Sequence, residues 1–282
     1  MNNGIDRALL LEPLVRGALL EDLAQGDITT DNLPALAAQQ AQATARARQP
    51  LTVSGLQTAA LAFTLTDARL CVEPLCADGD TLAAGAALLR VSGPACGILR
   101  AERTALNFLQ HLCGVATRTR QFADALAGTG ARIADTRKTT PGLRLLEKQA
   151  VIDGGGAPHR YHLGMAAMLK DNHIAACGGI ASAVAALRAR LSHLAKIEVE
   201  ADTLAQAREA LEAGADAILL DNMSLEALRE AVAMIGDRAI VEASGGITLE
   251  NARAVAQTGV RLISTSALTL GAPAVDIGLD WG

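Results

Sequence analysis

After Gly130 the chain alternates short apolar runs with amphipathic segments of helical periodicity. The apolar runs cover residues 131–135, 167–171, 196–200, 217–221, 239–243 and 261–265. Strand, helix, strand order with nearly continuous apolar strands is typical of parallel βαβ units covered by helices. A closed barrel of this kind needs about eight units. The pattern therefore predicts an open, incomplete parallel α/β barrel.

The part of the chain before this repeat does not alternate strands and helices regularly. Helical spacing is expected over residues 5–20 and 56–66 and from 95 to about 126, and strands over 42–48, 69–72 and 87–92. The acidic segment around Asp27 is best explained as a helix cap and turn. We therefore predict an α/β domain over residues 1–113 and a barrel over 114–271, with the tail 272–282 joining the first domain.

Charge and cysteine usage exclude several classes of protein. A formal net charge of -5 argues against nucleic-acid binding, for which a basic domain is expected. The five cysteines form no C-x-x-C pair, so neither a zinc site nor a disulfide framework is indicated. No apolar run reaches membrane-spanning length, and residues 1–6 lack the features of a leader peptide. We expect a cytoplasmic protein with neither nucleic-acid nor membrane partners.

Polar side chains follow the predicted barrel strands at the points where the strands end. In parallel α/β folds the loops at these ends build the active site. Helix caps or buried ion pairs explain one such residue more easily than a whole series, so we favour a functional site. The strand-end residues are Asp135, Arg137, Lys138, Lys170, Asp171, Asn172, His173, Glu200, Asp221, Asn222, Glu242 and Ser244.

These residues divide into two subsites. A cationic set suits carboxylates or phosphates, and arginine offers a planar two-point grip. It comprises Arg137, Lys138, His159, Arg160 and Lys170. Glu200 and Asp221 offer oxygen ligands that suit Mg²⁺, although neutralisation of the lysines is a close alternative.

Glycine-rich turns frame these subsites. Ser244-Gly245-Gly246 lies between a predicted strand and a helix, where backbone N–H groups can cradle a phosphate; alone it indicates only a tight turn. The glycines at 154–156 end a helix and let the chain turn His159 and Arg160 inward.

The segment 135–144 combines a strand end, cations and a helix-entry proline, which is typical of an anion site. We expect Asp135 to orient the neighbouring cations. Arg144 and Lys148 are expected on the helix surface or in a local positive field.

With these residues in place, the chain resembles the quinolinate phosphoribosyltransferase family, the decarboxylating nicotinate-nucleotide pyrophosphorylases, over nearly its whole length. The ordered series that carries the resemblance is Glu21-Asp22, residues 26–30, 102–107 and 135–148, His159-Arg160, residues 170–173, 198–200 and 220–222, and residues 242–246. The resemblance implies an N-terminal α/β sandwich before the open barrel. It also implies a homodimer, or a higher oligomer built from dimers, in which each sandwich covers the partner's barrel mouth.

The resemblance further implies a reaction. Quinolinate and phosphoribosyl pyrophosphate would give nicotinate mononucleotide, pyrophosphate and carbon dioxide, with Mg²⁺ as cofactor. The two quinolinate carboxylates would be held by Arg137, His159, Arg160 and Lys170, together with Arg103 from the neighbouring subunit. Lys138 would face the phosphoribosyl donor. Glu200 and Asp221 would hold Mg²⁺ with the ribose. Ser244, Gly245, Gly246 and Ser266 would bind the 5-phosphate, and Lys138, Lys170, Glu200 and Asp221 would be the catalytic residues.

Some positions depart from the family pattern. Residues 266–270 read Ser-Ala-Leu-Thr-Leu where Gly-Ala-Leu-Thr-His is usual, and Ile152 stands where arginine is common. Two alternatives therefore stay open: a molybdenum-transport-associated paralogue with another acceptor, and a phosphate-ligand-binding barrel without turnover. The intact Lys170-Asp171-Asn172-His173 favours the transferase.

Overall fold

The computed structural model describes residues 7–282, which form two compact units. The first contains the chain up to Thr117, with Ile152–Gly154 and Ala272–Gly282, and the second contains Arg118–Val151 and Gly155–Gly271. The division follows Thr117, whereas the sequence placed a boundary after Cys113. Helix α4 (Ala95–Ala125) runs unbroken through this region, so no turn signal marks the division. Ile5 and Asp6, at the start of the first predicted helix, lie outside the described residues, as does the rest of the 1–6 segment.

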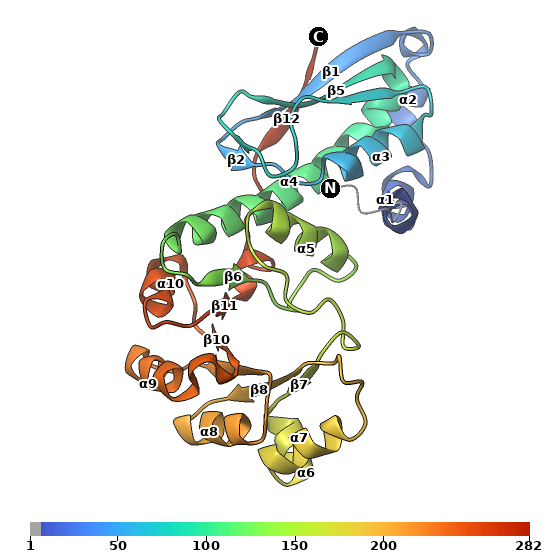
Figure 1. Ribbon diagram of the computed structural model, residues 1–282. Coiled ribbons are helices and arrows are strands. Elements are labelled where there is room, and N and C mark those ends of the chain that lie inside the picture. The colour runs from blue at the N-terminus through green and yellow to red at the C-terminus, as the bar shows by residue number, and fades with distance from the viewer. Residues whose placement is uncertain (1–6) are drawn as a thin grey trace. The chain divides into compact units, whose positions relative to one another are not determined.

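The first unit is built on a four-stranded antiparallel sheet of order β12-β1-β5-β3. The strands are β1 (Gln40–Ala47), β3 (Cys71–Pro74), β5 (Ala87–Pro94) and β12 (Ile277–Trp281), with a separate pair β2 (Leu51–Thr52) and β4 (Thr81–Leu82). The helical elements are α1 (Arg7–Leu23), α2 (Ile28–Asp31), η1 (Pro34–Leu36), α3 (Leu56–Thr66) and the first part of α4 (Figure 1).

Alternating burial along β1 shows how this sheet acquires its core. Ala43, Ala45 and Ala47 are buried, while the residues between them are only half-buried, as expected when successive side chains point to opposite faces. Helix α3 lies against β3 and β5 and contributes the fully buried ring of Phe63. The predicted helix over 56–66 is confirmed, and so are the strands near 42–48 and 87–92.

Two further features of this unit bear on the sequence interpretation. The side chain of Asp27 accepts hydrogen bonds from the N–H groups of Thr29 and Thr30, so the acidic turn is a cap of α2, as predicted. The C-terminal strand β12 pairs antiparallel with β1, with Ile277 opposite Ala47. This pairing places the tail in the first unit.

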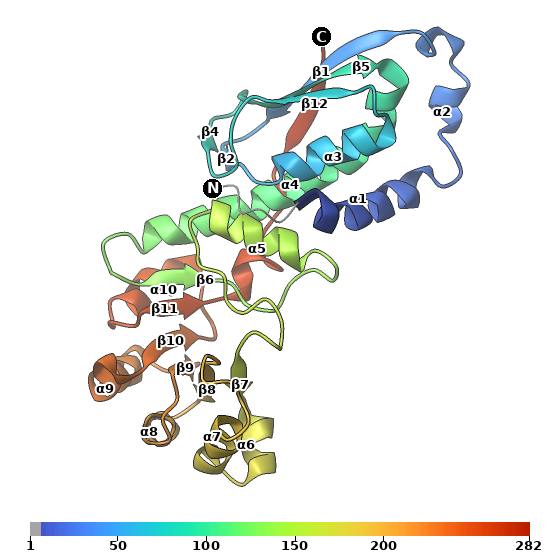
Figure 2. The same cartoon turned by 45° about the vertical axis from the view of Figure 1, so that its right-hand side comes forward.

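The second unit contains the six predicted strands in one parallel sheet of order β6-β11-β10-β9-β8-β7 (Figure 2). They are β6 (Arg132–Ala134), β7 (Ala167–Leu169), β8 (Ile197–Ala201), β9 (Ala217–Asp221), β10 (Ile240–Ser244) and β11 (Leu262–Ser264). The connecting elements are α5 (Arg144–Asp153), α6 (Asp171–Cys177), α7 (Ile180–Arg188), α8 (Leu204–Glu212), α9 (Leu225–Ile235), η2 (Gly236–Arg238), α10 (Leu249–Ala256) and η3 (Ser266–Leu268). Because β6 and β7 end the strand order unpaired with each other, the open α/β barrel is confirmed.

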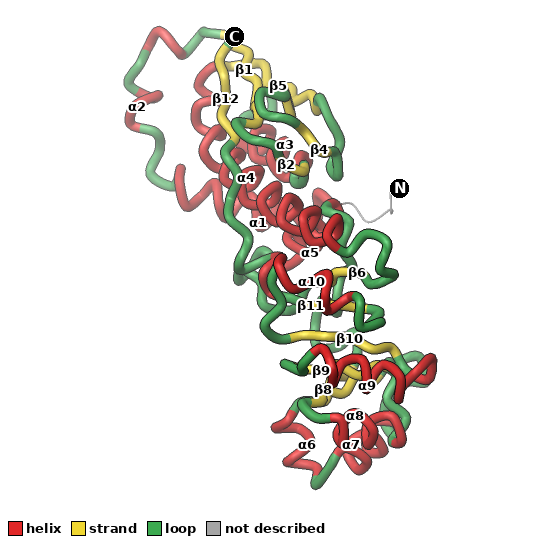
Figure 3. Tube along the Cα trace, turned by 90° about the vertical axis from the view of Figure 1, so that its left-hand side faces the viewer, coloured by secondary structure: helices red, strands yellow, loops and turns green. Residues whose placement is uncertain are grey.

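Helices α7 to α10 cover the outer face of this sheet (Figure 3). Val199 on β8 and Leu220 on β9 are fully buried, and alanines such as Ala210 and Ala231 bring the helices close to the strands. The alternate strand residues, including Glu198 and Glu200, point to the inner face. This alternation sends the apolar residues outward to the helices and the polar ones into the barrel.

Ala157 forms an isolated parallel bridge with Ala134 on β6, so the segment that carries His159 and Arg160 extends the sheet beyond β6. Gly155, just before it, has φ +90°, a left-handed conformation that suits glycine and ends α5 as predicted. Within the described part of the chain, no helix combines the length and apolar character needed to cross a membrane.

Candidate active site

A cavity of about 390 Å³ opens where the parallel strands end. Most of the predicted polar residues line it together, although they come from seven separate segments of the chain. The lining residues are Thr136, Arg137, Lys138, His159, Arg160, Met168, Lys170, Glu200, Leu219, Asp221, Glu242, Ser244 and Ser264. Four cations, three acids and two serines therefore line one cavity, as the sequence predicted for this edge of the sheet.

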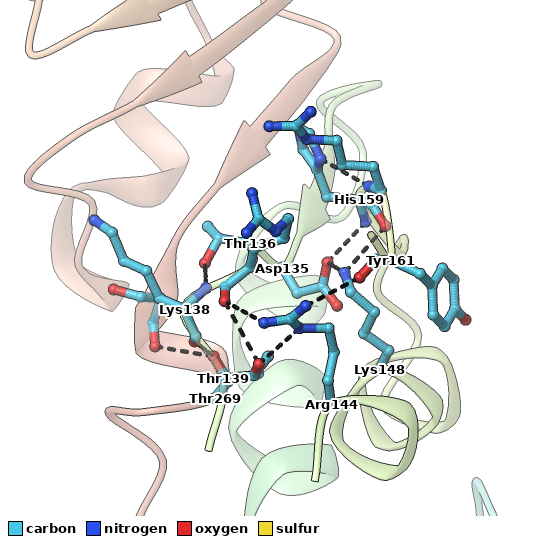
Figure 4. Close-up of polar contacts among 12 residues, drawn as sticks. Asp135, Thr136, Lys138, Thr139, Arg144, Lys148, His159, Tyr161 and Thr269 are labelled. Atoms are coloured by element: carbon cyan, nitrogen blue, oxygen red, sulfur yellow. Dashed lines mark hydrogen bonds and ion pairs between the residues drawn. The ribbon is translucent and has the colours of Figure 1, made fainter. Parts of the chain in front are cut away.

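The loop after β6 carries Arg137 and Lys138, and hydrogen bonds from outside the loop hold its shape. Thr269 Oγ1 donates to the carbonyl of Lys138 at 2.7 Å. Arg144 donates to Thr139 Oγ1 at 3.0 Å and to the carbonyls of Arg137 and Tyr161, each at 3.3 Å (Figure 4). Of the two roles predicted for Arg144, the helix surface is therefore wrong, while its charge does act locally: burial lowers the pKa of Lys148, and Arg144 adds to this. Its guanidinium has several donors in one plane and joins three points of the active-site loops.

The sequence interpretation also expected Lys148 on the helix surface or in a local positive field. The helix surface is wrong, because the side chain of Lys148 is 0% exposed. Its Nζ donates to Asp135 Oδ1 at 2.6 Å and to the carbonyl of His159 at 3.0 Å. Asp135 Oδ1 also accepts the N–H of His159 at 2.7 Å (Figure 4). Burial raises the pKa of Asp135 and lowers that of Lys148, while their mutual contact opposes both shifts. Asp135 thus orients the chain at His159 rather than the loop cations.

His159 and Arg160 cross the open side of the barrel. His159 Nε2 lies 3.3 Å from Glu198 Oε2 on β8, and the Nη1 of Arg160 donates to the carbonyl of Ala166, just before β7, at 2.9 Å. His159 Nδ1 accepts the backbone N–H of Arg160 at 2.7 Å. Both ring nitrogens of His159 are therefore engaged within the chain, and a carboxylate ligand would meet Arg160 and Lys170 more readily than this imidazole.

The acids at the ends of β8 and β9 lie on the same cavity. Glu200 forms an ion pair with Lys170, whose side chain is half-exposed at the end of β7. Asp221 Oδ2 accepts from the side chain of Asn222 at 2.6 Å. Both carboxylates come from adjacent parallel strands, with Glu200 opposite Leu219 in register. Such a pair of oxygen donors fits Mg²⁺, which usually takes one or two protein carboxylates and completes its shell with water and phosphate oxygens.

One cluster of possible metal ligands lies deeper. Among the described residues, His159, Glu198 and Glu242 place ligand atoms within 4.8 Å of one another. The imidazole nitrogen makes this group unsuited to Mg²⁺, which prefers oxygen. The sequence interpretation noted Glu242 at a strand end but assigned it no role. Its inward direction could have been found from its spacing, because Glu242 and Ser244 lie on the same face of one strand.

The Ser-Gly-Gly segment has the conformation that its sequence requires. Gly245 has φ +85°, and a Cβ there would lie 2.3 Å from Asn222 Oδ1, so this position accepts only glycine. The close approach exists because Asn222 N–H donates to the carbonyl of Ser244 at 2.9 Å. Gly246, at φ +60°, has no atom within 4 Å of an added Cβ. Of the three, Ser244 lines the cavity.

Besides Gly245 and Gly246, two predicted site residues are outside the cavity lining. Ser266 begins η3 and is half-buried, and the cavity wall is formed instead by Ser264 at the end of β11. Arg103 lies on α4 in the first unit, and its side chain is exposed.

Comparison with known proteins identifies the family of this chain. The model for the C-terminal domain of quinolinate phosphoribosyl transferase matches residues 115–280, and that for the N-terminal domain matches residues 27–113. This chain belongs to the quinolinate phosphoribosyltransferase family. A Bacillus subtilis relative, named as a probable carboxylating nicotinate-nucleotide pyrophosphorylase, is 40% identical over 96% of this chain and 93% of its own. The Homo sapiens nicotinate-nucleotide pyrophosphorylase (carboxylating) is 39% identical over the same shares.

Solved structures of the quinolinate phosphoribosyltransferase family share the whole fold. NadC from Streptococcus pyogenes superposes with a TM-score of 0.91 at 38% identity, covering 98% of both chains. The nicotinate-nucleotide pyrophosphorylase from Francisella tularensis gives a TM-score of 0.92 at 36% identity, covering 96% of both. The expected combination of an N-terminal α/β domain and an open barrel is therefore confirmed by structures as well as by sequence.

Proposed function

We propose that this protein transfers the phosphoribosyl group of 5-phosphoribosyl 1-pyrophosphate to quinolinate and decarboxylates the adduct, giving nicotinate mononucleotide, pyrophosphate and carbon dioxide for NAD biosynthesis. The observation that carries the proposal is the composition of the cavity: Arg137, Lys138, Arg160 and Lys170 supply a cationic wall in the same cavity as the strand-end acids Glu200 and Asp221. This "cationic wall" suits a dianion, and the acids suit a metal-bound pyrophosphate and a ribose.

The dicarboxylate is assigned to the side of the cavity formed by Arg137, Arg160 and Lys170. Arg160 keeps its guanidinium in place through Ala166 and Met168 on the opposite edge of the barrel, so little side-chain freedom is lost on binding. Burial lowers the pKa of Arg160, and the neighbouring Arg137 adds to this, which reflects two cations sharing one space. Two carboxylates in that space relieve the repulsion between these cations.

The phosphoribosyl donor is assigned to the remaining wall. Lys138, exposed at the loop after β6, faces its pyrophosphate, and Ser244 with the backbone of Gly245 and Gly246 takes the 5-phosphate. Glu200 and Asp221 would hold Mg²⁺, which when bound would neutralise the leaving pyrophosphate. Lys170, paired with Glu200, then links the acceptor and donor sides of the cavity.

In this arrangement the chain acts chiefly by positioning and electrostatics. The pyridine nitrogen attacks the anomeric carbon of ribose as the bond to pyrophosphate breaks. The ring nitrogen, now positively charged, stabilises the electron pair that stays on the adjacent ring carbon when its carboxylate departs as carbon dioxide. A proton then replaces that carboxylate on the ring.

The proposal includes a homodimer in which Arg103 of one subunit completes the other's carboxylate site. An exposed arginine on a long helix, with no role inside its own unit's core, supports this. Higher oligomers would be built from such dimers. Cytoplasmic localisation stays a prediction from the sequence.

The decisive experiment supplies quinolinate, phosphoribosyl pyrophosphate and Mg²⁺ to the purified protein and measures pyrophosphate, carbon dioxide and nicotinate mononucleotide. We expect the three products in equal amounts, with none when Mg²⁺ is chelated. Nicotinate is tested in parallel as the acceptor. Equal or better use of nicotinate would contradict the decarboxylating assignment, and binding of the donor without pyrophosphate release would indicate a barrel without turnover.

A further inference from the structure

Glu242 is the most buried of the carboxylates that line the cavity, and the proposed reaction has given it no role. It lies on β10 between β9 and β11, opposite Leu219 and Leu262 in register. Its side chain is 2% exposed, and Leu219 and Ser264 beside it are also buried, whereas Lys170 and Glu200 lie nearer the solvent. Glu242 therefore lies in the same register row as Glu200 but is far more deeply buried.

One oxygen of this carboxyl group has no hydrogen bond. Glu242 Oε1 is buried without a hydrogen-bond partner, and the nearest basic nitrogen is His159 Nε2 at 3.7 Å. His159 Nε2 lies nearer to Glu198 Oε2, at 3.3 Å. Buried polar atoms are nearly always satisfied, and each exception calls for a physical explanation. An unpartnered carboxyl oxygen that lines a ligand cavity points to a ligand of complementary charge.

Glu198 and Glu242 lie together beside His159, and we call this buried pair the acidic floor. Glu242 lines the same cavity as the cationic wall. The cationic wall suits the carboxylates of the ligand, so these must point away from the acidic floor. The pyridine ring, which is neutral in the substrate, then lies between the two. Under the proposed function its nitrogen bonds to ribose, and the ring becomes a cation that it was not in the ground state.

We propose that the carboxylate of Glu242 stabilises the positive charge that the pyridine ring acquires when its nitrogen bonds to ribose. An interaction that exists only once the charge has formed lowers the barrier without strengthening substrate binding. In a buried cavity such an interaction is stronger than in water, because little solvent screens it. This inference rests on the proposed function, since only a ribosylated pyridine provides the cation.

The environment of Glu242 agrees with this role. Burial raises the pKa of Glu242 to about 7, the neighbouring Glu198 adds to the shift, and His159 and Ser264 oppose it. The group is therefore readily converted between its neutral and ionised forms near neutral pH. A cation in the cavity favours the ionised form.

The test measures how a variant changes the binding of two ligands, quinolinate with a neutral ring and nicotinate mononucleotide with a cationic ring and a ribose phosphate. Quinolinate and nicotinate mononucleotide are titrated by calorimetry into wild type and Glu242→Gln, which keeps the shape of the side chain and removes its charge. We expect the dissociation constant of the mononucleotide to rise by about tenfold and that of quinolinate to stay within about twofold. In turnover, kcat should fall by about 10- to 100-fold with little change in the quinolinate KM, on the scale of other preorganised electrostatic contacts.

Two further variants support the comparison. Glu212→Gln makes the same chemical change at an exposed position on α8 and should leave both constants unchanged. Glu242→Asp keeps the charge and should retain more of the preference for the mononucleotide than Glu242→Gln. If the glutamine variant does not fold, the ratio of the two dissociation constants in Glu242→Asp tests the inference instead.

If Glu242→Gln weakens the binding of both ligands equally, the inference is overturned, because Glu242 then only supports His159 and the cavity walls. Unchanged binding of both would overturn it as well. Wild type that forms no nicotinate mononucleotide from quinolinate would instead refute the proposed function, and the wild-type assay is therefore done first.

Discussion

Lys148 Nζ lies 2.6 Å from Asp135 Oδ1, and both side chains are 0% exposed. The pair joins α5 to the end of β6, and through the backbone of His159 it also anchors the segment that spans the open side of the barrel. A buried lysine in this position cannot bind substrate. Its role is to fix the chain from which His159 and Arg160 reach the cavity.

Lys148→Met should destabilise the protein by about 3–5 kcal/mol, because it leaves the charge of Asp135 buried without its partner. Chemical denaturation measures this free energy of unfolding. Lys196→Met is the matched control: Lys196 also pairs with an aspartate, Asp216, but is 72% exposed and should contribute less than about 1 kcal/mol.

The double variant Asp135→Asn, Lys148→Met should be more stable than Lys148→Met alone, since no unpaired charge remains. If the two single losses simply add in the double variant, the ion pair does not couple these residues.

Thr269→Val should reduce activity while changing stability little. Its hydroxyl donates to the carbonyl of Lys138 at 2.7 Å, and a neutral hydrogen bond of this kind contributes about 1 kcal/mol. Because Lys138 faces the donor in the proposed site, steady-state kinetics should show a higher KM for phosphoribosyl pyrophosphate and a nearly normal KM for quinolinate. Thr64→Val, which removes an exposed hydroxyl that bonds to the carbonyl of Ala60, serves as control and should change neither.

Gly245→Ala should destabilise the protein more than Gly246→Ala. Both positions have positive φ, for which any side chain costs about 1–2 kcal/mol. Only at Gly245 would the new Cβ also collide with Asn222, at 2.3 Å from its Oδ1. Thermal unfolding measures the difference, and equal effects at the two glycines would show that the turn moves easily away from Asn222.

Stability should depend on pH through Glu242. Its pKa is about 7 in the folded protein against an ordinary value of 4.5, so the folded state binds the proton more tightly. The resulting stabilisation is complete below about pH 4.5 and is lost as the pH rises through 7. Its size is on the order of 3 kcal/mol, at about 1.4 kcal/mol per pKa unit. The unfolding free energy of wild type minus that of Glu242→Gln should therefore fall from pH 5 to pH 8. A constant difference would show that this carboxyl group has an ordinary pKa in the folded protein.

Arg103→Ala and Lys170→Ala should each be nearly inactive as homodimers. If Arg103 acts on the partner's site, a heterodimer of the two variants contains one intact site, so subunit exchange should restore up to about half of the activity per mixed dimer. Mass spectrometry of the intact oligomers monitors the exchange. Exchange without recovery of activity would place Arg103 outside the site.

Local sequence was a good guide wherever a residue's role depends on its immediate neighbours. The six barrel strands follow from their apolar runs, and the cap at Asp27 and the turn at Gly155 follow from the chemistry of one or two residues. The strand-end rule also placed Lys138, Lys170, Glu200 and Asp221 on one cavity, because parallel strands bring their carboxyl ends to the same edge.

The same reasoning misplaced Lys148 and Arg144, since a charged residue in an amphipathic segment is more often exposed than buried. Their environment depends on partners elsewhere in the chain: Asp135 lies 13 positions away from Lys148, and Tyr161 lies 17 away from Arg144. Glu242 was seen at a strand end, yet its contact with His159 and Glu198 requires three segments that only the folded barrel brings together.

By itself, then, the sequence determined the class of fold, the edge of the sheet where the chemistry collects and the family to which the chain belongs, because these depend on periodicity and on ordered local motifs. The tertiary structure alone decided which charged groups are buried against one another. Burial and pairing depend on distances across the barrel, and no spacing along the chain specifies them. The arrangement of cationic wall and acidic floor is therefore a property of the folded barrel.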